Sequence, residues 1–186
     1  MKNLNLVSYI VLLLSVTLFN ACVKDVDFDQ TEDILPTPVF ESSLIFSNLE
    51  APSFLDDVSQ QEVVVLTDTT RLEYINSDFF VDQLAKTNLT FKFTNSLDRD
   101  FNIAFEFVTD ADELRYLAEI DVPAGEPSNP ILVESSFLIE EPELSTFEEA
   151  TKLIYKITLP PSTNPISPTT LGSLKLESKA TFYFEL

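Results

Sequence analysis

Apolar and polar side chains alternate along the C-terminal part of the chain, from Leu174 to Leu186. Successive side chains of a β-strand point to opposite faces, so this alternation predicts a strand with one buried face. The same period of two runs from Leu89 to Phe93 and from Phe101 to Phe107. A strand with one apolar face needs a second layer to cover it, so the fold must contain packed sheets. We expect the C-terminal strand to be paired on at least one side.

Shorter alternating or continuously apolar runs predict the remaining strands. They are Phe40–Phe46, Val63–Leu66, Thr70–Tyr74, Leu114–Val122, Ile131–Ile139 and Leu153–Leu159. In the first run, we expect Phe40, Leu44 and Phe46 to face inward, with Ser43 and Ser47 outward. The polar stretch Asn95–Asp100 has the length of a hairpin turn.

Two short helices are expected among the strands. Ser77 could cap a helix that runs to about Lys86. Ser145 and Glu148 have the spacing of a capping box, which predicts a helix of about two turns from Ser145. Four prolines between residues 160 and 168 predict a rigid loop before the last strand. Together these patterns predict an all-β fold, an antiparallel two-sheet sandwich (immunoglobulin-like) with about eight strands and two short helices.

The N-terminal residues have the order of a secretory signal peptide. Lys2 supplies a positive charge, Leu6 to Phe19 form an apolar run, and the small Ala21 precedes Cys22, the single cysteine. We therefore divide the chain into a signal peptide (1–21), the acidic extended tether 22–38, and one β-sandwich domain (39–186).

The segment Leu18-Phe19-Asn20-Ala21-Cys22 resembles the lipobox of bacterial lipoproteins, although Phe19 occupies the place usually held by Leu. This resemblance implies that cleavage leaves Cys22 as a lipid-bearing N-terminus. Two alternatives compete with it. A transmembrane anchor would need about 20 apolar residues, more than this run provides. Ordinary signal cleavage would leave Cys22 as an unpaired thiol in an exported protein.

Lys24, Asp25 and Asp27 are similar to the export signal of Bacteroidetes surface lipoproteins, and Cys22 to Gln30 resembles the start of uncharacterised flavobacterial lipoproteins. The resemblance implies attachment to the outer membrane through acyl chains on Cys22, on the cell surface or on the inward face. The alternative is a plain acidic tether. A calcium-binding loop is not expected from the alternating acids, because Gln30 stands where such a loop needs Gly.

The charge balance restricts the partners. Removal of residues 1–21 leaves all 31 Asp and Glu residues and takes away one of the 11 Lys and Arg residues. Such an acidic surface repels nucleic acid and anionic headgroups, so we expect no nucleic-acid partner. The 16 phenylalanines give too much apolar surface for a disordered chain.

The chain lacks the residues that several kinds of catalytic and binding site require. The chain has no His, its single Cys is assigned to lipid, and two glycines cannot build a phosphate-binding loop. We expect no cofactor, no metal site and no enzymatic activity. Carboxylate pairs are the remaining catalytic candidates, and each also fits a solvated loop: Asp56-Asp57, Asp110 with Asp112, and Glu140-Glu141.

Binding functions stay open at this point. The favoured hypothesis is a non-enzymatic, lipid-anchored structural or accessory interaction module of the cell envelope. The alternative is a surface carbohydrate- or protein-binding lipoprotein that works with an outer-membrane transport complex. Tyr183 is the one tyrosine expected to face away from the core, and no Trp is present to stack on sugars. Asp68-Thr69-Thr70 resembles the O-glycosylation sequon of Bacteroidetes and also fits a polar turn.

Overall fold

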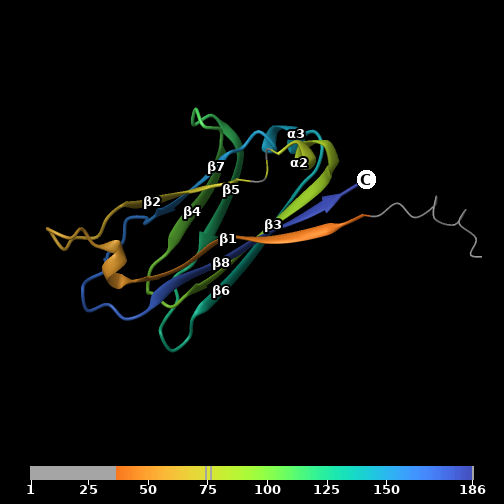
Figure 1. The fold of residues 1–186 in the computed structure, drawn as a ribbon. Coiled ribbons are helices and arrows are strands. Elements are labelled where there is room, and N and C mark those ends of the chain that lie inside the picture. Colours follow the sequence, from red (N-terminus) through yellow and green to blue (C-terminus); the bar gives the residue numbers. More distant parts are fainter. Residues whose placement is uncertain (1–36, 74, 76, 186) are drawn as a thin grey trace, which may run out of the picture. The chain divides into compact units, whose positions relative to one another are not determined.

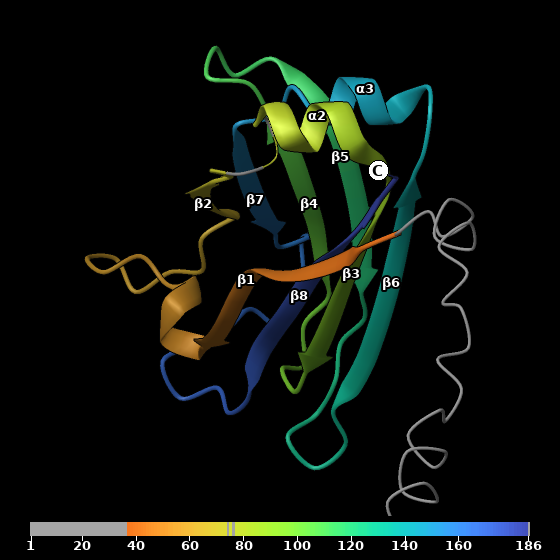
Figure 2. The same ribbon diagram turned by 45° about the vertical axis from the view of Figure 1, so that its right-hand side comes forward.

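The computed structural model describes residues 37–73, 75 and 77–185, which contain two four-stranded antiparallel sheets (Figures 1 and 2). The strands of the first sheet, here the β1 sheet, are in order β1 (Val39–Glu50), β8 (Ser173–Phe184), β3 (Leu84–Asn95) and β6 (Ile131–Ile139). Those of the second, the β2 sheet, are β2 (Val65–Arg71), β7 (Lys152–Thr158), β4 (Phe101–Val108) and β5 (Leu114–Val122). The predicted two-sheet antiparallel sandwich is confirmed.

The strand order is that of a jelly roll. Only β4 and β5 are both consecutive and paired, whereas every other connection passes from one sheet to the other. Jelly rolls are eight-stranded, two-sheet folds with this kind of crossing connection. The predicted immunoglobulin-like sandwich is therefore correct in its two packed sheets. The order in which the chain connects the strands differs from that of an immunoglobulin domain.

The core lies between the sheets and is rich in phenylalanine. Phe91 and Phe93 of β3 are fully buried and face Phe105 of β4, and the Phe91 and Phe105 rings stack with centroids 3.9 Å apart. The alternation predicted for β3 and β4 is confirmed, because each apolar residue of these rows is at most 2% exposed. Stacked rings from opposite layers hold the sheets together.

Strand β8 lies inside its sheet, with β1 on one side and β3 on the other. This position confirms that the strand is paired and explains its strict alternation. Its inward row is buried and comprises Leu174, Leu176, Ala180, Phe182 and Phe184.

The face predicted for β1 is wrong in its second half. Phe46 is 69% exposed, while Ser47 is half-buried. A register shift between Ser43 and Phe46 interrupts the pairing with β8, and the Ser178 hydroxyl fills the gap by bonding to the N–H and C=O of Ile45. The extra residue of such a bulge reverses the alternation beyond it, which a simple period of two does not foresee.

The stretch Asn95–Asp100 is not a hairpin turn. It passes from the β1 sheet to the β2 sheet, and Asn95, Leu97 and Arg99 are buried. The Asn95 amide donates to the carbonyls of Arg99 and Pro123 and accepts from the N–H of Leu97. A polar segment can therefore be interior when each of its groups has a partner.

Two of the sequence boundaries also change. Val63–Leu66 and Thr70–Tyr74 were expected to form separate strands, but a single strand, β2, spans Val65–Arg71. Helix α2 (Asp78–Gln83) follows Ser77 and ends before Lys86, because β3 begins at Leu84.

The predicted capping box is wrong. Helix α3 (Glu143–Phe147) starts two residues before Ser145, whose hydroxyl bonds to Glu141 and to the carbonyl of Pro142. A short 3₁₀ helix, η2 (Ala51–Phe54), follows β1. Both α-helices lie at the same end of the sandwich in Figure 2.

Candidate functional site

The residues predicted to carry the lipid and the export signal lie outside the described residues. They are Cys22, Lys24, Asp25 and Asp27. The same holds for the alternating acids of the tether. Anchoring and export therefore stay predictions.

In the predicted pair Asp56-Asp57, the carboxylate of Asp56 is engaged by its own loop. Asp56 Oδ1 accepts hydrogen bonds from the N–H groups of Val58 and Ser59 and from the Ser59 hydroxyl, at 2.7–3.1 Å. The bonds from Ser59 and Val58 lower the pKa of Asp56. This carboxylate shapes the loop after η2, in the manner of an Asx turn.

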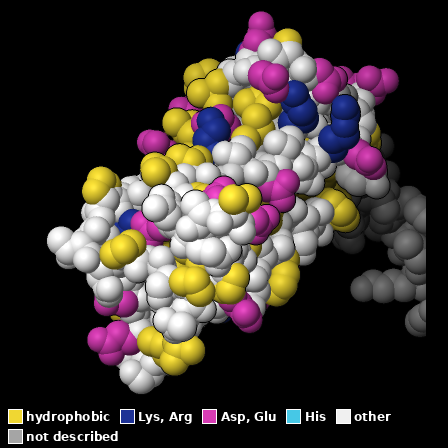
Figure 3. Space-filling view, turned by 90° about the vertical axis from the view of Figure 1, so that its left-hand side faces the viewer, with side chains coloured by type: hydrophobic (Ala, Val, Ile, Leu, Met, Phe, Trp, Pro, Cys, Tyr) yellow, Lys and Arg dark blue, Asp and Glu magenta, His cyan; other side chains and the backbone are white. Residues whose placement is uncertain are grey.

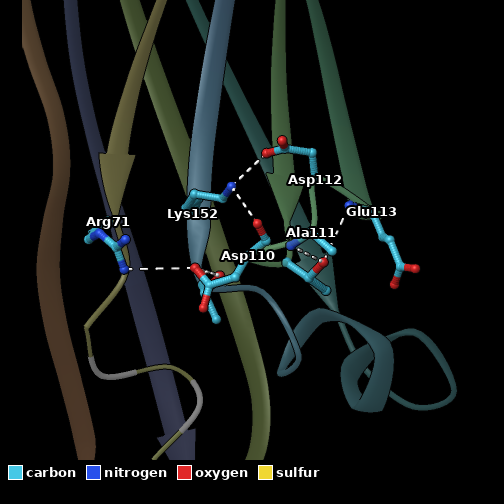
Figure 4. A network of polar contacts seen from close by, with 8 residues as sticks. Arg71, Asp110, Ala111, Asp112, Glu113 and Lys152 are labelled. Atoms are coloured by element: carbon cyan, nitrogen blue, oxygen red, sulfur yellow. Dashed lines mark hydrogen bonds and ion pairs between the residues drawn. The ribbon is translucent and has the colours of Figure 1, made fainter.

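Asp110 and Asp112 lie in the turn between β4 and β5, where each meets a cation of a neighbouring strand (Figure 4). Lys152 Nζ is 2.5 Å from Asp112 Oδ1 and donates to the carbonyl of Asp110. Arg71 Nη1 is 3.7 Å from Asp110 Oδ1. These contacts attach the turn to β7 and β2, which is a structural role.

Glu140 and Glu141 are likewise engaged by their own chain. Glu140 lies 3.9 Å from Lys86 Nζ, and Glu141 accepts the hydroxyl of Ser145. Within the described residues, no group of three or more His, Cys, Asp or Glu side chains could hold a metal ion.

The outer face of the β1 sheet is mainly polar and charged. A hollow of about 280 Å³ lies on it, lined by Thr90, Lys92, Glu134, Glu177, Ser178 and Lys179. Tyr183 faces outward as predicted, half-buried, with Lys86 Nζ 5.3 Å from its ring centroid. Phe46 is separated from Tyr183 along β1, since Tyr183 pairs with Val39 and Phe46 with Glu177. The two rings therefore do not make one aromatic platform.

The sandwich is open along the side formed by β1 and β2. Neither strand contains a fully buried residue, whereas each of the other strands has at least one. On the opposite side β5 and β6 contact each other and close the layers. Interior-facing residues of the open side, such as Leu66 and Thr70, are thus only partly covered.

A groove runs between the two edges, and we call it the β1–β2 groove. Its volume is about 250 Å³. Its floor is apolar, formed by Phe40, Leu44, Leu72, Ile75, Phe80 and Phe182. Its rim is polar, formed by Ser42, Ser43, Thr70, Arg71 and Glu73.

Phenylalanine rings shape one end of the groove. Phe80 of α2 packs edge-on against Phe182 and Phe184, with centroids 5.1 Å apart in both pairs. Phe40 and Phe79 extend this cluster to the surface, where they are 51% and 53% exposed. An aromatic cluster that is half in water is a feature of binding surfaces more than of cores.

Tyr155 lies beneath the open side, and Asp68 is its neighbour on β2. Burial, and then the Asp68 carboxylate, raise the pKa of Tyr155. Asp68 is directly opposite Tyr155 in the β2–β7 pairing, so its charge stands on the core-facing side of an exposed edge. Sequence analysis missed this arrangement, because it depends on which strands become edges.

Comparison with known proteins finds distant structural neighbours. No family model and no curated protein matches the sequence. The VP2 subviral particle of infectious bursal disease virus is similar in structure, with 8% identity and a TM-score of 0.49, over 80% of this chain and 33% of that chain. A candidate secreted protein of Parabacteroides distasonis has 10% identity and a TM-score of 0.45, over 63% and 38% of the two chains.

The tailspike protein 4 enzymatically active domain of bacteriophage CBA120 has 8% identity and a TM-score of 0.39, over 78% of this chain and 19% of that one. This chain thus spans about a third of the viral capsid protein and less of the tailspike. In the part of the chain that the structure describes, no helix has the length and apolar character needed to cross a bilayer.

Proposed function

We propose that this chain is a non-enzymatic, lipid-anchored protein of the bacterial cell envelope, and that its sandwich binds a partner protein along the open β1–β2 side. The observation that carries the binding role is the exposure of a partly apolar interior between two sheet edges. The anchor is supported by the N-terminal sequence pattern that ends at Cys22.

The size of the groove favours a protein partner over a small molecule. Sites for small ligands usually enclose about 300–1,000 Å³ and bury most of the ligand. The β1–β2 groove, at about 250 Å³, is smaller than this range and suits one or two side chains of a larger partner. The carboxylate pairs considered for catalysis are already engaged in loop contacts.

A carbohydrate partner is less well supported. Sugars stack on exposed aromatic faces, and the outer faces of the described sheets carry only separated rings. The exposed ring of Phe40 lines the groove instead, and the exposed ring of Phe79 packs against Phe184 in the cluster at the end of the groove. Binding of the chain to a glycan array would support the carbohydrate-binding alternative.

The anchor and the binding surface need separate tests. Metabolic labelling with a fatty-acid probe should mark the native chain and leave a Cys22→Ala variant unlabelled. A photo-crosslinking residue at Thr70, on the rim of the groove, should capture a specific envelope protein in living cells. The same residue at Ser136, on the outer face of β6, is the matched control. Equal capture from both positions would contradict the proposed surface.

A further inference from the structure

We infer that the partner supplies an extended segment, in which apolar residues are interspersed with Lys or Arg, and that this segment pairs with the free edge of β2. The inference rests on the proposed binding role of the open side and names the chemistry of the partner. Addition of a strand to an exposed sheet edge is a common mode of peptide recognition.

The hydrogen bonds of β2 show which of its backbone groups are free. The N–H of Leu72 donates to the carbonyl of Thr151, and the N–H of Leu159 donates to the carbonyl of Val64, so even-numbered residues bond to β7. In an antiparallel pair, alternate residues direct their backbone groups to the other side. The backbone groups of Val65, Thr67, Thr69 and Arg71 therefore point to the open edge.

The edge is accessible and regular. Val65, Thr67, Thr69 and Arg71 are exposed, and the pairing with β7 runs without a register shift from Val65 to Arg71. Strand β1, across the groove, has a register shift between Ser43 and Phe46, which disrupts its edge. A straight peptide strand therefore fits β2 better than β1.

One donor of this edge is held by the chain itself. The N–H of Thr69 bonds to the Asp68 carboxylate at 2.7 Å. Because this N–H bonds to a side chain of its own strand and not to β7, it agrees with the alternation inferred above. An incoming strand would offer a carbonyl to Thr69, and a Lys or Arg of that strand would neutralise the released Asp68.

Apolar side chains of the incoming strand would continue the core. Residues on its inward face would lie beside Leu66 and Thr70 and over the apolar floor of the groove. Two exposed large hydrophobic residues adjoin this path: Phe40 lines the groove, and Val65 begins the free edge of β2.

The charge of the same region selects a basic partner. Residues 39–83 contain nine Asp or Glu residues and one Arg, and two of these acids, Glu41 and Glu62, pair with Lys179 and Arg99 from other parts of the chain. Arg71 has an ion pair with Asp110, so it does not offset the acids around the groove. Figure 3 shows apolar and acidic side chains intermixed on this face, with some Lys and Arg side chains among them. A second copy of this chain would bring the same acids and is therefore disfavoured as the occupant.

The experiment uses the full chain, extracted from membranes in mild detergent, and two synthetic peptides of about eight residues. In one peptide Val alternates with Lys and Thr, and in the other Glu replaces Lys. NMR-detected hydrogen exchange should show that the Lys peptide protects the amides of Val65, Thr67, Thr69 and Arg71. The Glu peptide should bind at least about tenfold more weakly, a difference of about 1.4 kcal/mol.

Matched variants test the backbone and the charge separately. Thr67→Pro removes one N–H from the free edge and leaves the bonds to β7 intact, so it should weaken peptide binding about tenfold or more. Thr67→Val keeps the N–H and should bind as the wild type does. Glu73→Lys on the rim should weaken binding of the Lys peptide more than Glu119→Lys, which makes the same charge change on the outer face of β5.

Four results would overturn the inference: no protection of the β2 amides, equal binding of both peptides, no effect of Thr67→Pro in a folded protein, or protection by self-association of the chain. These results leave the proposed function standing if a partner still crosslinks at Thr70 and not at Ser136. If neither crosslinking nor peptide protection occurs, both proposals fail.

Discussion

Arg99 and Glu62 form a buried ion pair with two hydrogen bonds. Arg99 Nε lies 3.1 Å from Glu62 Oε2, and Arg99 Nη2 lies 2.6 Å from Oε1. Glu62 belongs to the loop between β1 and β2, and Arg99 to the crossing between β3 and β4. The N–H of Ile166, in the proline-rich loop, also donates to Glu62 Oε2. One carboxylate thus joins three loops at one end of the sandwich.

Removal of one partner of this pair should cost considerable stability. In Arg99→Met, the Glu62 carboxylate keeps only the N–H of Ile166, and breaking a buried pair typically costs about 3–5 kcal/mol. Urea unfolding should therefore show a loss of about 3 kcal/mol. The double variant Arg99→Met, Glu62→Leu should recover part of that loss. A double variant no more stable than Arg99→Met would contradict this account.

The same pair should make stability depend on pH in the acid range. Burial alone would raise the pKa of Glu62, but hydrogen bonds from Arg99 and Ile166 and the charge of Arg99 lower it from its ordinary value of 4.5. The ionised Glu62 therefore makes its full contribution to the free energy of unfolding above pH 4.5. This contribution is lost as the pH falls through the lowered pKa. The free energy of unfolding of the wild type should approach that of Glu62→Gln in acid. A constant difference between pH 7 and pH 3 would argue against the pair.

Glu148 should affect stability with the opposite sign. Burial, and then the nearby charge of Glu141, raise the pKa of Glu148. The folded protein therefore holds this proton more tightly than the unfolded chain, and the ionised form costs stability at neutral pH. Glu148→Gln should be more stable than the wild type at pH 7, and this advantage should vanish below pH 4. Glu143→Gln, at an exposed position of α3, is the control.

Both glycines are predicted to be essential for packing. A Cβ at Gly125 would lie 2.0 Å from the carbonyl oxygen of Asn95, and one at Gly172 would lie 2.2 Å from that of Ser96. Gly172 also has a φ of +117°, which disfavours other residues. Gly125→Ala and Gly172→Ala should each lose about 3 kcal/mol or fail to fold. Leu171→Ala, beside Gly172 and 76% exposed, should change the melting temperature little.

The central phenylalanine stack should carry much of the stability. Phe91→Ala would empty a site between the sheets, where its ring stacks on Phe105, and such changes cost about 3–5 kcal/mol. Phe46→Ala removes a ring that is 69% exposed and should change stability by about 0.5 kcal/mol at most. Chemical denaturation of both variants measures the loss in free energy of unfolding at each position. Similar losses would contradict the inward and outward assignment of β1 and β3.

The sequence by itself determined most of the strands and the buried faces of β3, β4 and β8. Alternation in β3, β4 and β8 predicts the buried rows because the period of a strand is local and needs no knowledge of the partner. The same reasoning failed at Phe46, where a side-chain bond from Ser178 stabilises a bulge. It also failed at Asn95, whose buried amide bonds to the nearby Leu97 and Arg99 and to the distant Pro123.

The tertiary structure alone decided the strand order, and with it the candidate site. Local sequence does not specify that β1 and β2 become the edges of different sheets and face each other across a groove. The interior-facing row of β2 contains the polar residues Asp68 and Thr70, and only the long-range pairing shows that this row lies at an open edge. Edge position is set by long-range pairing, so the free backbone groups of β2 and the acids around them become one surface only in the folded chain.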